Sequence, residues 1–143
     1  MNKSSNILVL DLILDYSIFG MRNFRELKIW QKAFQIAPNS FQITNSFPKQ
    51  EKFGLASQIN RAGISIPSNI AEGCSRNSNK DCTRFLEISI GSCFELETQL
   101  LIAKELKFGN QELILFTLEL LTEEEKMLTA FKISLKQQLN RNG

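Results

Sequence analysis

The sequence predicts an all-α protein, an antiparallel up-down-up-down four-helix bundle. Apolar residues recur every three to four positions along four long segments, which is the period of a helix. Neither the alternating pattern of a half-buried strand nor an Asn-Gly hairpin turn accompanies them. Short polar connections join the four segments, and short connections favour antiparallel neighbours. The length of 143 residues suits one domain with a single core.

The first twenty residues do not share this pattern. The stretch NILVLDLILDYSIFG is apolar but carries Asp11 and Asp15, so it is too short and too charged to span a membrane. It is also a poor signal peptide. We therefore expect Met21 to be the physiological start. Residues 1–20 are then a disordered or loosely packed extension that need not be native, and residues 21–143 form the bundle domain.

The first helix is predicted to begin near Phe24 and to end before Pro48. Proline disfavours the helical conformation in the residue before it, which places the boundary in the stretch NSFPK. Pro38 lies inside the helix and should kink it or cost it a turn. A row at helical spacing marks the expected core face: Phe24, Leu27, Trp30, Phe34 and Phe41.

The second helix is predicted over residues 49–76. Its apolar row steps by three or four without interruption through Leu55, Ile59, Ala62, Ile66, Ile70 and Cys74. The row passes straight through the stretch SIPSNIAEG, although Pro67 and Gly73 are poor helix formers.

The third and fourth helices are predicted over residues 79–107 and 110–140. Ser78 or Asn79 should cap the third helix with Asp81 in its first turn, and Gly109 should follow its end as the C′ residue. Thr122 and Glu125 could form a capping box that restarts the fourth helix, but one continuous helix is favoured because no Gly or Pro interrupts it. Its expected core face comprises Ile114, Leu118, Leu121, Leu128, Phe131, Leu135 and Leu139.

Small residues around Pro67 indicate a packing device. The stretch SIGSC, residues 89–93, is equally rich in small side chains and lies opposite in an antiparallel hairpin of helices. Small side chains let two helix backbones approach closely. Pro67 and Gly91 are therefore expected to serve architecture, and a catalytic loop is the less favoured interpretation.

A polar row runs beside the apolar row of the second helix. Glu97 falls in an apolar row of the third helix, and a buried carboxylate needs a partner. Counting along the antiparallel pair places Arg61 near Glu97, which predicts a salt bridge between them. The expected structural polar network comprises Arg61, Asn69, Glu72, Glu95 and Glu97.

The residue inventory argues against an enzyme. The chain has no histidine, and its three cysteines lack C-x-x-C spacing, so a zinc site, a histidine-based triad and a disulfide framework are all unfavourable. No catalytic residue, metal ligand or cofactor is predicted. Unpaired thiols fit a reducing cytoplasm. No association with a membrane is expected.

Charge is unevenly distributed along the chain. Residues 22–85 hold ten Lys and Arg against four acids, whereas residues 86–125 hold nine Glu against two Lys. Such asymmetry marks either a face that binds a polyanion or helices of opposite charge that pair with one another. The candidate nucleic-acid contacts are Arg22, Arg25, Lys28, Lys32, Arg61, Arg76, Lys80 and Arg84.

Four blocks of sequence resemble the four-helix-bundle protein family, also known as the ribosomal-RNA intervening-sequence protein family. They are FRELKIWQKA, FPKQEKFGLASQINRAGISIPSNIAEG, FLEISIGSCFELETQLLIA and MLTAFKISLK. Members are often encoded within intervening sequences of bacterial large-subunit ribosomal RNA genes. Related accessory proteins of diversity-generating retroelements form pentameric barrels that bind nucleic acid and a reverse transcriptase through basic surfaces. Asn60 and Gly63 depart from the family pattern, which more often has a base and an alanine there.

Two functions follow as expectations. Several helices carry apolar residues outside a single stripe, which predicts a ring-like homo-oligomer, and the resemblance favours a pentamer. The first function is a non-enzymatic oligomer that binds RNA or DNA through basic surfaces of the first two helices. The alternative is a protein-interaction scaffold that docks a partner such as a polymerase and does not bind nucleic acid itself.

Overall fold

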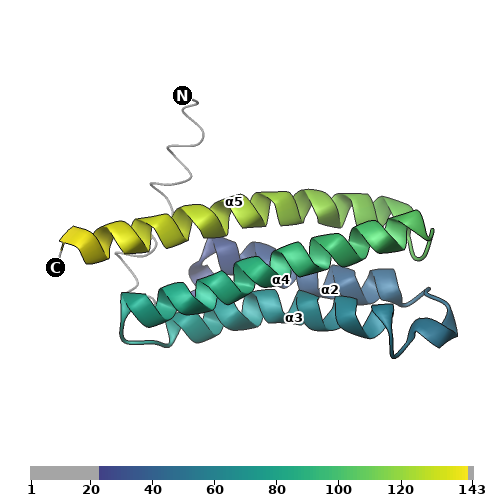
Figure 1. Ribbon diagram of the computed structural model, residues 1–143, viewed down its shortest axis with the longest axis horizontal. Coiled ribbons are helices and arrows are strands. Elements are labelled where there is room, and N and C mark those ends of the chain that lie inside the picture. The colour runs from purple at the N-terminus through teal and green to yellow at the C-terminus, as the bar shows by residue number, and fades with distance from the viewer. Residues whose placement is uncertain (1–22, 142–143) are drawn as a thin grey trace, which may run out of the picture.

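The computed structural model describes residues 23–141, which form a bundle of four long helices (Figure 1). These are α2 (Lys28–Thr44), α3 (Leu55–Cys74), α4 (Asn79–Glu105) and α5 (Gln111–Arg141), and short 3-10 turns, η1 (Phe24–Glu26) and η2 (Lys49–Glu51), precede α2 and α3. Residues 23–141 contain no strand. The predicted all-α four-helix bundle is confirmed, and the expectation for residues 1–20 lies outside the described residues.

Consecutive helices run antiparallel and pack side by side, and α5 closes the bundle against α2. Asn39 on α2 donates to the Thr117 hydroxyl on α5 at 3.3 Å. This arrangement brings the starts of α2 and α4 to the same end of the bundle as the ends of α3 and α5, at the left of Figure 1. We call this the basic end, because it carries Arg25, Lys28, Arg76, Lys80 and Arg84.

The core follows the predicted stripe of α3. Ile59, Ala62, Ile66, Ile70 and Cys74 are all buried, and Leu55 is half-buried at the rim. Facing side chains complete the core from α4 and α5, among them Leu86, Leu96, Leu100, Leu121, Leu128 and Leu135. A continuous row of this kind turns one face of each helix inward, where removal of apolar surface from water stabilises the fold.

The predicted core face of the first helix is right at its start, where Leu27 is buried and Phe24 and Trp30 pack against the core, and wrong further along α2. Phe34 and Phe41 are 56% and 48% exposed, and the buried row is the neighbouring one: Ile29, Ala33, Ile36, Ser40 and Ile43. Both rows have helical spacing, so the period alone did not identify the buried one. The Phe34 ring stacks on the ring of half-buried Trp30, with ring centroids 4.8 Å apart. Helix α2 continues through Pro38, which is exposed.

The close contact between α3 and α4 confirms the expected packing of small residues. The Ser65 and Ser92 hydroxyls lie 2.8 Å apart, and Ser89 donates to the Ile66 carbonyl at 2.9 Å. Gly91 does not take part, because it is exposed and a Cβ placed on it would meet no atom within 4 Å. The architectural role expected of Gly91 is therefore wrong.

Two predicted helix starts are wrong: 3-10 turns come first, so α2 begins at Lys28 and not near Phe24, and α3 begins at Leu55 and not at residue 49. The boundaries around α4 and α5 follow the sequence except at one position. The Ser78 hydroxyl accepts from the Asp81 amide at 3.1 Å, which confirms the cap of α4. Helix α5 is continuous through Thr122, as predicted. Lys107, with a φ of 57°, occupies the C′ position after α4. The hydrogen bond from the Phe108 amide to the Ala103 carbonyl, at 2.9 Å, identifies this position, because it is the bond that the residue after C′ makes in a Schellman motif. Gly109 has a φ of 78° but lies two residues further on.

Candidate nucleic-acid interface

Five of the predicted basic residues gather at the basic end of the bundle. Arg25 belongs to η1, Lys28 begins α2, Arg76 follows α3, and Lys80 and Arg84 lie in the first two turns of α4. All five are exposed. They meet because antiparallel helices bring the start of α2 beside the turn from α3 to α4, where Ser78 caps the new helix. Arg22 lies outside the described residues.

Contacts differ among these five residues. Arg76 pairs with Glu72 at 2.5 Å and covers the ring of Phe85 with its guanidinium carbon 4.7 Å from the centroid. Within residues 23–141, neither Lys80 nor Arg84 takes part in an ion pair or a hydrogen bond of the side chain. Both side chains therefore face solvent without an ion pair in the described part of the chain, although the acid Asp81 lies beside Lys80 in the sequence and one helical turn before Arg84.

Two predicted contacts lie apart from this end. Lys32 forms an ion pair with Glu123 on α5, and the hydrogen bond from Lys32 lowers the pKa of that carboxyl. Arg61 is exposed near the middle of α3. The structure thus separates the eight sequence candidates into a cluster at the basic end, one paired lysine and one isolated arginine.

The predicted polar network does not form as a unit among the described residues. No salt bridge joins Arg61 to Glu97; the Glu97 carboxyl instead lies beside Glu125 of α5. The Ser65–Ser92 contact fixes the register of α3 against α4, and this register places Glu95 opposite Arg61. The predicted Arg61–Glu97 salt bridge is wrong because Glu95 and Glu97, two residues apart, lie on different sides of α4: Glu95 faces α3, whereas Glu97 faces α5.

The remaining members of that network form separate local pairs. Asn69 donates to the Ser65 carbonyl at 2.8 Å and to its hydroxyl at 3.0 Å. Glu72 binds Arg76, and Gln99 donates to Glu95 at 3.1 Å. Each pair therefore orders its own helix surface, and none places two reactive groups against a common substrate position.

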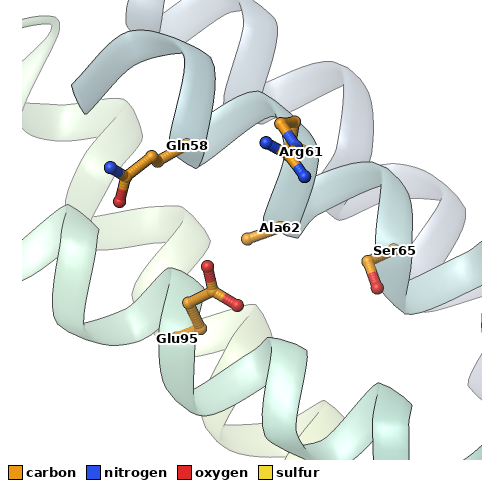
Figure 2. A pocket seen from close by; sticks show the side chains of 5 residues that line it. All are labelled: Gln58, Arg61, Ala62, Ser65 and Glu95. Atoms are coloured by element: carbon orange, nitrogen blue, oxygen red, sulfur yellow. The ribbon is translucent and has the colours of Figure 1, made fainter. Parts of the chain in front are cut away.

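A hollow of about 320 Å³ lies between α3 and α4 (Figure 2). Gln58, Arg61, Ala62 and Ser65 line it from α3, and Glu95 faces them from α4. Three of these residues are long polar side chains, so the hollow has hydrogen-bonding groups and a small apolar floor at Ala62.

A buried acid on α5 was not predicted from the sequence. Glu124 is fully buried, neither of its carboxyl oxygens has a hydrogen-bond partner, and burial raises its pKa to about 9 despite the charge of Lys32. On α4, Cys93 is also buried, and burial, then the nearby Glu124, raises the pKa of its thiol. The spacing of Leu121 and Leu128 could have indicated this burial, because a continuous buried row at steps of three and four passes through Glu124.

Residues 23–141 contain neither a cluster of metal ligands nor a membrane-spanning helix. No group of three or more acidic or thiol side chains is placed to hold a metal ion there. None of the helices in this part of the chain is both long enough and apolar enough to cross a membrane.

Comparison with solved structures identifies a protein of the same fold. It is a crystal structure, at 1.70 Å resolution, of a protein of unknown function from the S23 ribosomal protein family of Bacteroides thetaiotaomicron VPI-5482. The match has 25% sequence identity and a TM-score of 0.64, and it covers 70% of this chain and 94% of that chain. A search of the curated proteins found no match.

A family model extends this similarity across most of the bundle. The model for the 23S rRNA-intervening sequence protein matches residues 25–130, from η1 to the middle of α5. The resemblance inferred from the four sequence blocks is thereby confirmed, and the chain belongs to the 23S rRNA-intervening sequence protein family.

Proposed function

We propose that this protein is a non-enzymatic homo-oligomer that binds RNA or DNA through the basic end of its bundle. The observation that carries the proposal is that Lys80 and Arg84 are exposed and outside any ion pair of residues 23–141, at the same end of the bundle as Arg25, Lys28 and Arg76. Exposed cations bind a phosphate backbone by releasing its counterions, without reading sequence. The family name, which refers to intervening sequences of 23S rRNA, supports nucleic acid as the ligand.

Charge removal at the basic end is expected to weaken binding and its salt dependence together. The double variant Lys80→Gln/Arg84→Gln should lower affinity for a generic RNA or DNA strand about tenfold at low salt. If both residues contact phosphate, the slope of log K against log salt should fall by about 1.4 for a single strand. Fluorescence anisotropy over a salt series measures both quantities.

A matched control is available at the other end of the bundle. Lys49→Gln/Lys52→Gln removes the same charge from two exposed lysines in and after η2. This control should bind as the unchanged protein does. Equal losses in both double variants would show that net charge alone governs binding, and no binding by the unchanged protein would overturn the proposal.

Assembly into a ring would repeat the basic end and raise affinity through avidity. The exposed aromatic residues Phe34 and Phe41 of α2, beside half-buried Trp30, support self-association, because a monomer rarely presents such a row to water. The double variant Phe34→Glu/Phe41→Glu should dissociate the assembly, measured by light scattering after size exclusion. Gln35→Glu/Gln42→Glu, at exposed polar positions of α2, should leave its mass unchanged. A mass unaffected in both, or a monomer from the outset, would contradict this interface.

The same apolar surface also favours the alternative, a scaffold that docks a protein partner such as a polymerase. In that case the unchanged protein would bind neither RNA nor DNA at low salt. We place the protein in the cytoplasm because its three cysteines are buried and none of them forms a disulfide, which suits a reducing compartment.

A further inference from the structure

The hollow between α3 and α4 contains polar groups whose hydrogen-bonding capacity is not used by other groups of residues 23–141. Gln99 occupies one oxygen of the Glu95 carboxylate at 3.1 Å, which leaves its other oxygen open as an acceptor. Among residues 23–141, Arg61 and Gln58 have no side-chain hydrogen bond or ion pair. Ser65, by contrast, is engaged by Ser92 and Asn69.

The opposite charges restrict what this hollow can accept. A bare phosphate would suit Arg61 but would be repelled by Glu95, which Figure 2 shows directed from α4 toward the α3 wall. A ligand must therefore offer hydrogen-bond donors to the carboxylate and negative charge to the guanidinium. An unpaired nucleotide has both, because an exocyclic amino group is a donor and the backbone phosphate is an anion.

The volume and the position agree with such a ligand. About 320 Å³ lies at the lower end of the range for small-molecule sites, roughly 300–1,000 Å³. Arg61 on α3 and Arg76, two residues past the end of that helix, are fifteen residues apart, or about 22 Å at ~1.5 Å per residue. A single strand of about seven nucleotides, at ~3.4 Å each, would connect the hollow to the basic end.

We propose that this hollow binds one unpaired, amino-bearing base of a single-stranded nucleic acid and discriminates cytosine from uracil. The proposal rests on the proposed nucleic-acid function. Glu95 accepts a hydrogen bond from the N4 amino group of cytosine, and Arg61 binds the adjacent phosphate. Uracil presents an acceptor oxygen at the same position, which the Glu95 carboxylate repels.

The test compares single-stranded oligo(C) and oligo(U) of about 12 nucleotides, which differ at that ring position. The unchanged protein should bind oligo(C) about tenfold more tightly than oligo(U). Glu95→Gln should reduce the preference to near unity, because an amide can donate to uracil as well as accept from cytosine. Arg61→Gln should weaken both complexes equally. Glu105→Gln, an exposed acid at the end of α4, is the control and should keep the tenfold preference.

The outcomes separate this inference from the proposed function. If both oligomers bind and Glu95→Gln leaves their ratio unchanged, the base site is wrong while the basic end stands. If the hollow instead holds a cationic side chain of a protein partner, no base preference exists in any variant, which also overturns the inference. If neither oligomer binds at low salt, the proposed function fails and this site fails with it.

Discussion

Between pH 5 and pH 9, the free energy of unfolding is expected to fall with rising pH, and one buried acid contributes up to about 1.4 kcal/mol per unit. The cause is Glu124, whose pKa is raised from 4.5 to about 9 by burial. In this interval the native state holds a proton that the unfolded chain has lost, so each rise in pH favours unfolding. The stabilisation is complete below pH 4.5, is lost progressively above it, and is exhausted above pH 9.

The groups around Glu124 explain why no partner offsets its burial. Lys32 on α2 lowers the pKa of Glu124, but its ammonium pairs with exposed Glu123. On α4, Cys93 contributes a buried neutral thiol. Glu125, the next residue on α5, has its own pKa raised to about 7 by burial and then by Glu97, so it adds to the same trend up to neutral pH.

Substitution of Glu124 should remove most of this pH dependence and raise stability. Glu124→Leu fills a similar volume without a buried polar group, so it should stabilise the fold at pH 7 by about 1–3 kcal/mol. Urea unfolding followed by circular dichroism from pH 5 to pH 9, at constant ionic strength, measures the effect. Glu119→Gln, an exposed acid on the same helix, should keep the slope of the unchanged protein.

Two results would contradict this account. One is a stability that rises from pH 5 to pH 9 in the unchanged protein, which would require Glu124 to be ionised and paired in the native state. The other is an equal slope in the unchanged protein and in Glu124→Leu, which would assign the titration to other groups.

Sequence periodicity was sufficient where only one row of a helix was apolar. Helix α3 has one such row, and its members from Ile59 to Cys74 are buried as predicted. Helix α2 has two rows, one aromatic and one of Ile and Ala, and the aromatic row was predicted to face the core although Phe34 and Phe41 are exposed. The spacing was helical in both cases, so the choice depended on contacts with α3 and α5 that period alone does not contain.

The candidate site shows the same division between local and long-range information. Local sequence correctly predicted the cap at Ser78, which positions Lys80 and Arg84 on the first turns of α4. The pairing of Arg61 depended on which face of α4 packs against α3, and that face carries Glu95, whereas Glu97 faces α5. Glu124 was missed because three consecutive glutamates are typical of an exposed helix surface, although the second of the three is buried in the core.

Replacement of Gly109 by alanine is expected to destabilise the fold by about 3 kcal/mol. Gly109 has a φ of 78°, a conformation that costs an L-residue about 1–2 kcal/mol. An added Cβ would also lie 2.8 Å from the Ile43 carbonyl oxygen and 2.8 Å from a ring carbon of Phe47. The carbonyl belongs to the last turn of α2, so the turn between α4 and α5 would have to move away from that helix.

Gly91→Ala is the matched control, because a Cβ added at Gly91 would meet no atom within 4 Å, whereas one added at Gly109 would be crowded. Gly91 lies inside α4, is exposed, and has open space around its Cα, so alanine should stabilise the protein by about 0.5–1 kcal/mol through helix propensity. Urea midpoints for the two variants should therefore move in opposite directions. A neutral Gly109→Ala would mean that the α4–α5 turn is not held against α2. A destabilised Gly91→Ala would mean that another backbone approaches α4 at this position, as an interface between subunits would require.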